Sequence, residues 1–333
     1  MYAADSRDGY DDILCCGIAF FKKRCMVRKK QLSAGEYLRT LPPCAAGTVC
    51  GVQKPLHSLF YSRIMLNGDF CFANAMLRNQ KGHHLGETRM EIYVIAHKDF
   101  SRKYIDGIRK VLLVGANRNQ PGSYDYKDNC GNDNISDKNK NFCELTGLYW
   151  VWKHSHADVV GLEHYRRYFA GSRIKRTPPL SEKAIQDILS EHDMVVPRKR
   201  KYDGYTCKKQ FAKWHKSEVW DECCRLLKRK YPEYAVCFET LEKRKSGYAY
   251  NMFIASKTII DSYCEWLFDV LFELDRTIDL SQYNDYNQRM WGFLSERLFN
   301  VWIMKNNIDV YEEPVFFFDE TSWFNTLLGS LKA

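Results

Sequence analysis

Residues 128–169 read DNCGNDNISDKNKNFCELTGLYWVWKHSHADVVGLEHYRRYF and combine three local patterns. A loop rich in Asp, Asn, Gly and Ser covers 128–141, and such side chains favour turns because they hydrogen-bond to the nearby backbone. A helix follows, which we expect Asn141 to cap, with Glu144 completing a variant of the capping box. An apolar strand, Val159-Val160-Gly161-Leu162, then ends in the polar run Glu163-His164-Tyr165-Arg166-Arg167.

The end of this strand carries groups expected of an anion-binding site. Open α/β sheets bind ligands beyond the carboxyl ends of their strands, and arginines suit phosphate because each guanidinium donates two parallel hydrogen bonds. Arg166 and Arg167 are therefore candidate phosphate ligands, while Glu163 and His164 are candidate catalytic groups. An exposed arginine pair beside a core imidazole is the alternative, although the polar loop upstream favours a site.

The length and composition fit one large α/β domain or two small ones. The 333 residues are 45% hydrophobic, which is enough for a sizeable core. No apolar run approaches the roughly 20 residues of a membrane-spanning helix, and the run at 13–21 has its charged flanks in the reverse order of a secretion signal. The expected location is therefore cytoplasmic. Thirteen cysteines without a C-x-x-C pair favour reduced, buried thiols over disulfides or zinc.

The net charge of +9 belongs mostly to the N-terminal segment. Residues 1–89 hold 13 Lys or Arg and 7 Asp or Glu, which leaves +3 for residues 90–333. A nucleic-acid-binding protein needs a basic surface on its folded domain, so that class is disfavoured. Basic clusters at 22–24 and 28–30 predict peripheral contact with anionic lipid instead.

The segment 1–89 is expected to be a poorly ordered or non-native extension, because it shows no sustained period of either 2 or 3.6 residues. Met90 directly precedes the first well-formed strand, as a natural start would. An intact mass of the native protein that includes earlier residues would exclude Met90 as the start.

From residue 90 onward, strands alternate with helices, which predicts a mostly parallel α/β sheet flanked by helices and a helical C-terminal part. The expected strands are 92–96, 111–115, 159–162, 192–197 and 247–255. The expected helices are 141–152, 180–191, 207–243 with a break at Pro232, 258–276 and 285–305. In the last helix a buried stripe is formed by Trp291, Leu294, Leu298, Val301 and Trp302, while Arg289, Glu296 and Asn300 share another face, with Arg297 beside it.

Seven ordered motifs between Glu91 and Phe318 resemble those of one family. They are His97-Lys98-Asp99, Asp133-Asn134-Ile135-Ser136-x-Lys138-Asn139, Cys143-Glu144-Leu145-Thr146-Gly147-Leu148-Tyr149-Trp150, His164-Tyr165-Arg166-Arg167-Tyr168-Phe169, Lys230-Tyr231-Pro232-Glu233-Tyr234, Asn251-Met252-Phe253-Ile254 and Gly292-Phe293-Leu294-Ser295-Glu296-Arg297-Leu298. Together they look like a bacterial glycosyltransferase family long catalogued only as a domain of unknown function, found in capsule, exopolysaccharide and O-antigen gene clusters. Residues 1–89 lie outside the resemblance.

The resemblance implies a GT-A-like, Rossmann-like domain over residues 90–333 that transfers a sugar from a nucleotide-sugar donor. The expected donor is UDP-linked, with galactose in pyranose or furanose form, and the expected acceptor is a growing polysaccharide or a lipid-linked sugar. In GT-A enzymes an Asp-x-Asp motif holds a divalent metal, and here Glu163-His164-Tyr165 stands in its place. This departure leaves two alternatives. Either Mn²⁺ or Mg²⁺ binds Glu163 and His164, or the diphosphate is neutralised without metal by Lys98, Arg166 and Arg167.

The expected sugar transfer needs further groups. An inverting enzyme needs a carboxylate to deprotonate the acceptor hydroxyl, and Glu296, Asp285 and Asp99 are the candidates. Donor contacts are expected from His97, Lys98, Asp99, Asn134, Ser136, Lys138 and Asn139, and acceptor contacts from Asn251, Arg289 and Arg297, with His215 either joining them or facing solvent.

Two other classes compete with the enzyme: a non-catalytic sugar-nucleotide-binding or carbohydrate-binding scaffold of the same fold, and a nucleic-acid-binding protein.

Overall fold

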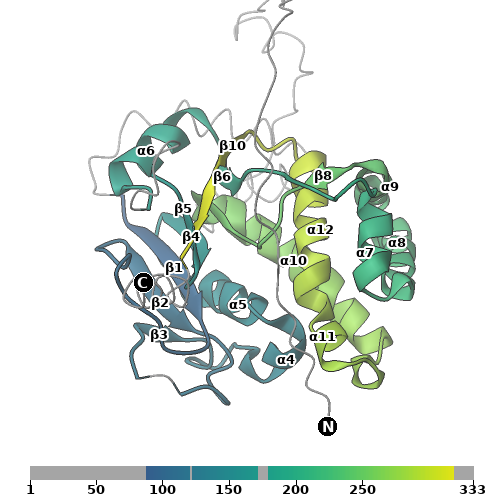
Figure 1. The fold of residues 1–333 in the computed structure, drawn as a ribbon, viewed down its shortest axis with the longest axis horizontal. Helices are drawn as coiled ribbons and strands as arrows, with labels where there is room; N and C mark the ends of the chain where they lie inside the picture. Colours follow the sequence, from purple (N-terminus) through teal and green to yellow (C-terminus); the bar gives the residue numbers. More distant parts are fainter. Residues whose placement is uncertain (1–87, 121, 172–178, 319–333) are drawn as a thin grey trace, which may run out of the picture. The chain divides into compact units, whose positions relative to one another are not determined.

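The computed structural model describes residues 88–120, 122–171 and 179–318, in which helices surround a nine-stranded sheet (Figure 1). The expected N-terminal extension and its basic clusters lie almost wholly outside these residues. The strands of the sheet are β1 (Met90–Ala96), β2 (Arg109–Leu113), β3 (Tyr126–Lys127), β4 (Val159–His164), β5 (Arg167–Phe169), β6 (Met194–Pro197), β9 (Phe253–Ser256), β10 (Val310–Glu313) and β11 (Val315–Phe317). A separate two-stranded ribbon pairs β7 (Arg200–Lys201) with β8 (Ser246–Gly247).

The strands lie in the order β10-β6-β9-β4-β1-β2-β3, with β5 and β11 attached beside β4. Strands β4, β1, β2 and β3 are mutually parallel, as are β10 and β6, whereas β9 is antiparallel to both neighbours. The predicted mostly parallel α/β class is confirmed, with β9 as an exception that strand periodicity does not reveal. Because β6 and β4 both run opposite to β9, strands β1, β2, β4 and β6 all end at one side of the sheet, which we call the carboxyl edge.

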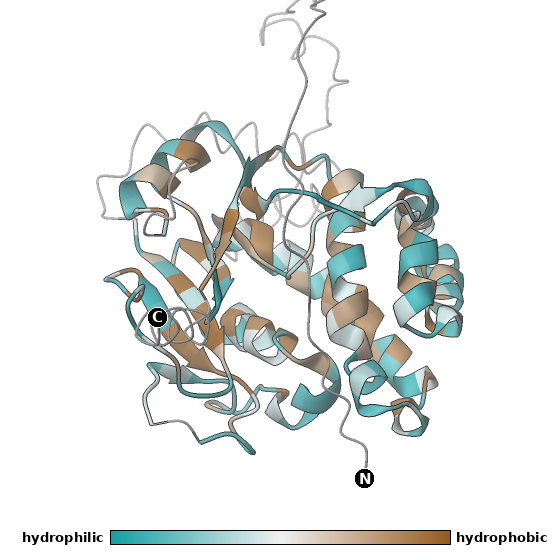
Figure 2. Cartoon of the chain, viewed as in Figure 1, coloured by the Kyte–Doolittle hydropathy of each residue, from teal (hydrophilic) through white to brown (hydrophobic). Residues whose placement is uncertain are grey.

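Helices cover both faces of the sheet because alternate strand residues point to opposite sides. Tyr93 and Ile95 of β1 join the large core beneath α5, α10 and α12, while Ile92 joins the smaller core beneath α6. Figure 2 shows the central strands mostly in brown, as expected for strands buried on both faces. The helices are η1 (Ser136–Lys138), α4 (Asn139–Phe142), α5 (Leu145–His154), α6 (Glu182–Glu191), α7 (Cys207–Trp214), α8 (Ser217–Lys230), α9 (Pro232–Lys243), α10 (Lys257–Thr277), η2 (Leu280–Gln282), α11 (Asp285–Gln288) and α12 (Met290–Lys305).

The predicted apolar stripe of the last helix is confirmed, since Trp291, Leu294, Leu298 and Val301 are fully buried. Pro232 begins α9, where its missing N–H would have no partner in the helix. Within the described ranges, no helix combines the length and the apolar composition needed to cross a bilayer.

Three predicted elements are interrupted. The helix expected at 141–152 divides into α4 and α5 because Cys143 adopts φ 51°, and Asn141 caps neither part but donates its side-chain N–H to the carbonyl of Gln288 at 2.8 Å. The strand expected at 247–255 breaks where Tyr250 and Asn251 adopt φ 77° and 50°. The helix expected at 285–305 divides at Arg289. Side-chain hydrogen bonds join the three interruptions, from Arg289 to Cys143 and from Asn251 to Glu144.

Candidate functional site

Three cationic side chains, each from a different part of the chain, lie within electrostatic range of His97 at the carboxyl edge. Lys98 follows β1, Arg166 follows β4, and Arg289 joins α11 to α12. The ring centre of Tyr165 lies 5.8 Å from Lys98 Nζ and 5.3 Å from Arg166 Cζ. The three cations form no ion pair with any carboxylate of the described ranges, so their charge is available to an anion. We call Lys98, Arg166 and Arg289 the cation cluster.

His97 lies among these cations. Its ring packs edge-on against Tyr165, with the ring centres 5.4 Å apart. Burial lowers the pKa of His97, and the positive charges of Lys98, Arg289 and Arg166 lower it further. The imidazole is therefore neutral at pH 7, and it lies within electrostatic range of all three cations.

Arg289 is positioned by the break in the first interrupted helix. Its Nε–H donates to Cys143 Sγ at 3.3 Å, and its guanidinium lies 5.4 Å from the ring centre of Phe293. Burial and the nearby charge of Glu144 raise the pKa of Cys143 to about 11, so the sulfur is a thiol that accepts this hydrogen bond. The terminal nitrogens of Arg289 have no hydrogen-bond partner among the described residues.

The Tyr250–Asn251 corner ties three elements together beside the cluster. His164 Nε2 must donate to the carbonyl of Tyr250, 2.6 Å away, because a carbonyl only accepts. The Tyr250 N–H donates to Glu296 Oε1 at 2.8 Å, and the side-chain amide of Asn251 donates to Glu144 Oε1 at 2.6 Å. The corner thus fixes β4, α12 and the start of α5 relative to one another.

Glu163, predicted to be catalytic, is instead part of a buried ion pair. Arg109 Nε donates to Glu163 Oε2 at 2.8 Å, and both side chains are 0% exposed. The Phe169 N–H donates to Glu163 Oε1 at 2.9 Å. Burial raises the pKa of the Glu163 carboxyl, and the positive charge of Arg109 opposes that shift. Sequence reasoning missed Arg109 because it lies within a strand, 54 residues before its partner.

Glu163 and His164 do not fit the predicted divalent metal site. Both oxygens of Glu163 already accept hydrogen bonds, and His164 Nε2 carries a hydrogen. The described part of the chain contains no group of three or more His, Cys, Asp or Glu side chains that could hold a metal ion.

The polar loop predicted to contact the donor folds around a buried carboxylate, Asp128. It accepts hydrogen bonds from the Gly115 N–H at 2.7 Å, Ser136 Oγ at 2.6 Å and Thr146 Oγ1 at 2.5 Å. The remaining predicted residues of the loop also bond within the protein. Asn134 donates to the Gly131 carbonyl, Asn139 donates to the Cys143 carbonyl, and Lys138 pairs with Asp275 at 2.6 Å.

The predicted acceptor contacts separate into one exposed residue and two buried ones. Arg289 belongs to the cation cluster, whereas Asn251 is 3% exposed and Arg297 is 6% exposed. Arg297 donates to Glu296 Oε2 and to Gln210 Oε1, both at 2.6 Å. Asn251 and Arg297 therefore position other groups, and both oxygens of Glu296 are occupied.

The other candidates lie at varied depths. Asp285 is exposed at the start of α11, and exposed Asp99 accepts from the Gly122 N–H at 2.9 Å. His215 is buried rather than solvent-facing, with its ring centre 4.2 Å from that of Phe293. The guanidinium of Arg167 lies 5.0 Å from the ring centre of Tyr250.

The buried histidines give a testable dependence of stability on pH. Burial lowers the pKa of His164 and of His215 to about 4, with added repulsion from Arg167 and Arg297 respectively. Between pH 4 and 6.5 the unfolded chain therefore binds more protons than the folded one. Stability is complete above about pH 6.5 and falls toward pH 4, by roughly 1.4 kcal/mol per pH unit for each histidine.

Urea unfolding at pH 7, 6 and 5 measures this dependence. His164→Gln should flatten it, whereas replacing the exposed His156 with glutamine should not. An unchanged slope in His164→Gln would contradict the assignment.

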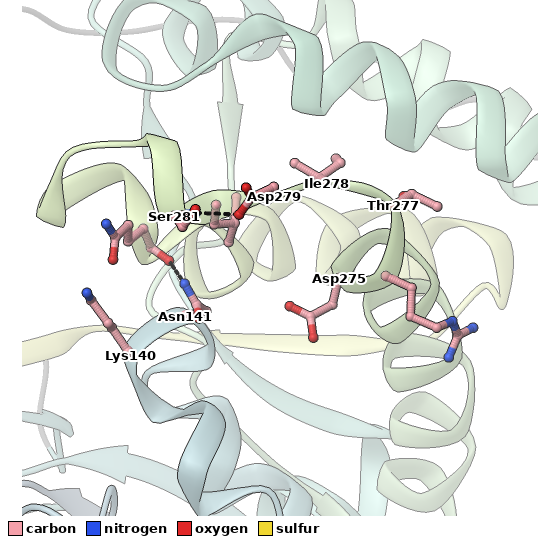
Figure 3. Close-up of a pocket in the computed structure, with 10 residues that line it drawn as sticks. Lys140, Asn141, Asp275, Thr277, Ile278, Asp279 and Ser281 are labelled. Carbon is pink, nitrogen blue, oxygen red and sulfur yellow. Dashed lines mark hydrogen bonds between the residues drawn. The ribbon is translucent and has the colours of Figure 1, made fainter.

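A pocket of about 520 Å³ lies between α4 and the end of α10 (Figure 3). Its lining includes Lys140, Asp275, Asp279 and Gln288, and the Asn141–Gln288 hydrogen bond crosses its wall. None of its lining residues belongs to the cation cluster or to the predicted site. The pocket is therefore separate from the cation cluster.

Comparison with known proteins identifies a similar solved structure and a matching family. Among solved structures, the chain is similar to the apo structure of the bifunctional glycosyltransferase WbbM, with a TM-score of 0.62 and 31% sequence identity. The likeness covers 70% of this chain and 46% of that one, so this protein spans about half the length of the WbbM chain. No curated protein matches the chain.

The WbbM likeness and the mostly parallel sheet confirm the α/β, GT-A-like fold class. Residues 91–307 match the family described as Domain of unknown function (DUF4422). The match covers about two thirds of the sequence, and the chain therefore belongs to the DUF4422 family.

Proposed function

We propose that this protein is a glycosyltransferase that binds the diphosphate of a nucleotide-sugar donor at Lys98, Arg166 and Arg289. The observation that carries the proposal is the convergence of these three unpaired cations at the carboxyl edge of a parallel sheet. Ligands of open α/β sheets bind at this edge. The likeness to a glycosyltransferase structure supports the same chemistry.

The cluster suits the chemical problem of sugar transfer. Breaking the bond between the sugar and the diphosphate places negative charge on the leaving phosphate while the sugar becomes oxocarbenium-like. Cations fixed before the reaction stabilise that charge without reorganising. Lys98 and Arg166 lie beside the Tyr165 ring, and a hydrogen bond to Cys143 orients Arg289.

Glu144 joins the candidates for the acceptor base. Burial lowers the pKa of Arg289, whereas the contact with Cys143 and the negative charge of Glu144 raise it, and the net shift is upward. The Glu144 carboxylate therefore lies near the cluster. The Asn251 side chain donates to Glu144 Oε1 and fixes its direction. Among the residues predicted for this role, Glu296 has both oxygens occupied, while Asp99 and Asp285 are exposed.

The donor and acceptor are proposed from the family resemblance. We propose a UDP-linked donor, with galactose as the sugar, and a growing capsular, exopolysaccharide or O-antigen glycan as the acceptor, processed on the cytoplasmic side of the membrane.

A screen of UDP-, GDP-, CMP- and dTDP-sugars tests the donor site. Thermal shift detects even weak ligands, because stabilisation grows with the ratio of ligand concentration to dissociation constant. We expect one nucleotide class to raise the unfolding temperature, and to do so equally with Mn²⁺ and with EDTA. Failure of every sugar nucleotide to stabilise the folded protein would contradict the proposal.

A non-catalytic scaffold is the second candidate, and one observation favours it. Glu163 stands in the place of a metal-binding carboxylate of GT-A enzymes, but it forms a buried ion pair with Arg109. Binding of a sugar nucleotide without nucleotide release, in the presence of varied glycan acceptors, would support the scaffold. Release of nucleotide above the uncatalysed rate would support the enzyme.

A further inference from the structure

Seven exposed basic residues gather around the ribbon of β7 and β8. One run, Arg198-Lys199-Arg200-Lys201, follows β6, and the other, Lys243-Arg244-Lys245, ends α9 and leads into β8. The runs lie side by side because β7 pairs with β8 and the Tyr202 N–H donates to the Lys245 carbonyl at 2.9 Å. We call these seven residues the basic ribbon.

The charge of the basic ribbon is concentrated and largely unneutralised. Within the described ranges, Lys199 is the one member that forms an ion pair, with Glu312 at 2.8 Å. Residues 90–333 carry a net charge of +3, so without these seven cations they would carry −4. The domain therefore has a strongly basic patch on a slightly acidic remainder.

The basic ribbon adjoins the candidate donor site. Strand β6 ends at the carboxyl edge, and Arg198 follows it directly. Arg200 Cζ lies 5.4 Å from the ring centre of Tyr250, whose carbonyl accepts from His164. The patch and the cation cluster are thus connected through the Tyr250–Asn251 corner.

We propose that the basic ribbon docks the protein on a bilayer of anionic phospholipid, with the carboxyl edge of the sheet beside the lipid surface. Clusters of roughly four to eight Lys or Arg residues have this affinity, because each adds attraction to the negative surface. A nucleic acid is disfavoured because residues 90–333 carry a net charge of only +3, whereas a planar bilayer can contact the patch alone. The docking is inferred from the charge of the basic ribbon alone. The idea that docking brings the site to a lipid-linked acceptor rests on the proposed function.

Vesicle flotation of the full chain tests the docking. The probes are phosphatidylcholine vesicles with and without one third phosphatidylglycerol. The ribbon variant is Arg198→Gln/Lys201→Gln/Lys243→Gln/Lys245→Gln. The control removes the same charge from α6 and α8 as Lys183→Gln/Arg225→Gln/Lys228→Gln/Arg229→Gln. At about 0.1 M salt, we expect the ribbon variant to bind anionic vesicles about tenfold less than the parent chain, with less than about a twofold change in the control.

Three outcomes would overturn the proposal: equal losses in both variants, undiminished binding in the ribbon variant, or tighter binding of the parent chain to a single-stranded oligonucleotide than to anionic vesicles. Hydrogen exchange of the parent chain provides a readout that needs no variant, since anionic vesicles should slow exchange at 198–203 and 243–247. Thermal shift with nucleotide sugars, measured without vesicles, separates the two proposals. If the ribbon variant is still stabilised by the donor but no longer floats with anionic vesicles, docking by the ribbon is supported. If no nucleotide sugar stabilises the parent chain, only the proposed function is contradicted.

Discussion

Replacing Arg109 with methionine is expected to lower the free energy of unfolding by about 3–5 kcal/mol, the largest stability effect we predict. The substitution leaves the Glu163 carboxylate fully buried without its counter-ion, and the Phe169 N–H alone cannot neutralise it. Arg109 also donates to the Leu180 carbonyl at 3.1 Å, so a second buried acceptor loses its partner. Urea unfolding with the slope held common to both proteins measures the loss.

The control for this prediction is Arg225→Met. Arg225 pairs with Glu222 on the exposed surface of α8, where an ion pair contributes about 0–1 kcal/mol. A loss in Arg109→Met no larger than that in Arg225→Met would contradict the buried pair. Glu163→Gln adds a functional test. We expect it to lose stability while keeping its affinity for the donor nucleotide, whereas unchanged stability with lost turnover would return Glu163 to the catalytic role predicted from sequence.

Arg166→Ala is expected to weaken binding of the donor nucleotide by about 10- to 100-fold. A hydrogen bond from a guanidinium to a phosphate contributes roughly 1.5–3 kcal/mol, and Arg166 has no other ionic partner among the described residues. Arg166 is exposed at the end of β4, so its removal should leave the unfolding temperature of the free protein unchanged. Isothermal titration with the nucleotide selected by the screen measures the change.

The phosphate dependence makes this prediction specific. The loss should be large for the nucleoside diphosphate, smaller for the monophosphate and absent for the nucleoside, and Lys98→Ala and Arg289→Ala should follow the same series. Arg225→Ala, which removes an equal charge from α8, should change each affinity less than about twofold, because a distant surface charge is screened. Equal losses for nucleoside and diphosphate would place Arg166 at the base or ribose instead.

Strong local patterns predicted the elements well. The apolar runs at β1 and β4, the buried stripe of α12 and the proline at the start of α9 depend on neighbouring residues, so they can be read from the sequence. The antiparallel placement of β9 and the Arg109–Glu163 pair depend on contacts across the fold, which no local pattern encodes.

The candidate site was predicted in part, for the same reason. Strand ends placed Lys98 and Arg166 at one edge, and helical spacing in the last helix singled out Arg289, although as an acceptor contact. The donor roles expected of Ser136 and Asn139 rested on the polar composition of their loop and on its resemblance to a family motif, and the structure uses both side chains to build the loop around Asp128. The breaks at Cys143, Asn251 and Arg289 appear in the sequence as continuous helix or strand, yet their contacts converge beside the cation cluster. Local rules fail where the chain departs from regular structure to build a site.

The Tyr250–Asn251 corner has a consequence for how the site would fail. Two successive residues with positive φ cost about 1–2 kcal/mol each, so the corner persists only while its hydrogen bonds to β4, α5 and α12 hold it. Local opening at these two residues would release the strand end that carries Arg166 and the helix junction that carries Arg289 in one event. The two arginines are thus coupled mechanically through a backbone bend that neither of them touches, and the site would be lost as one cooperative unit rather than residue by residue.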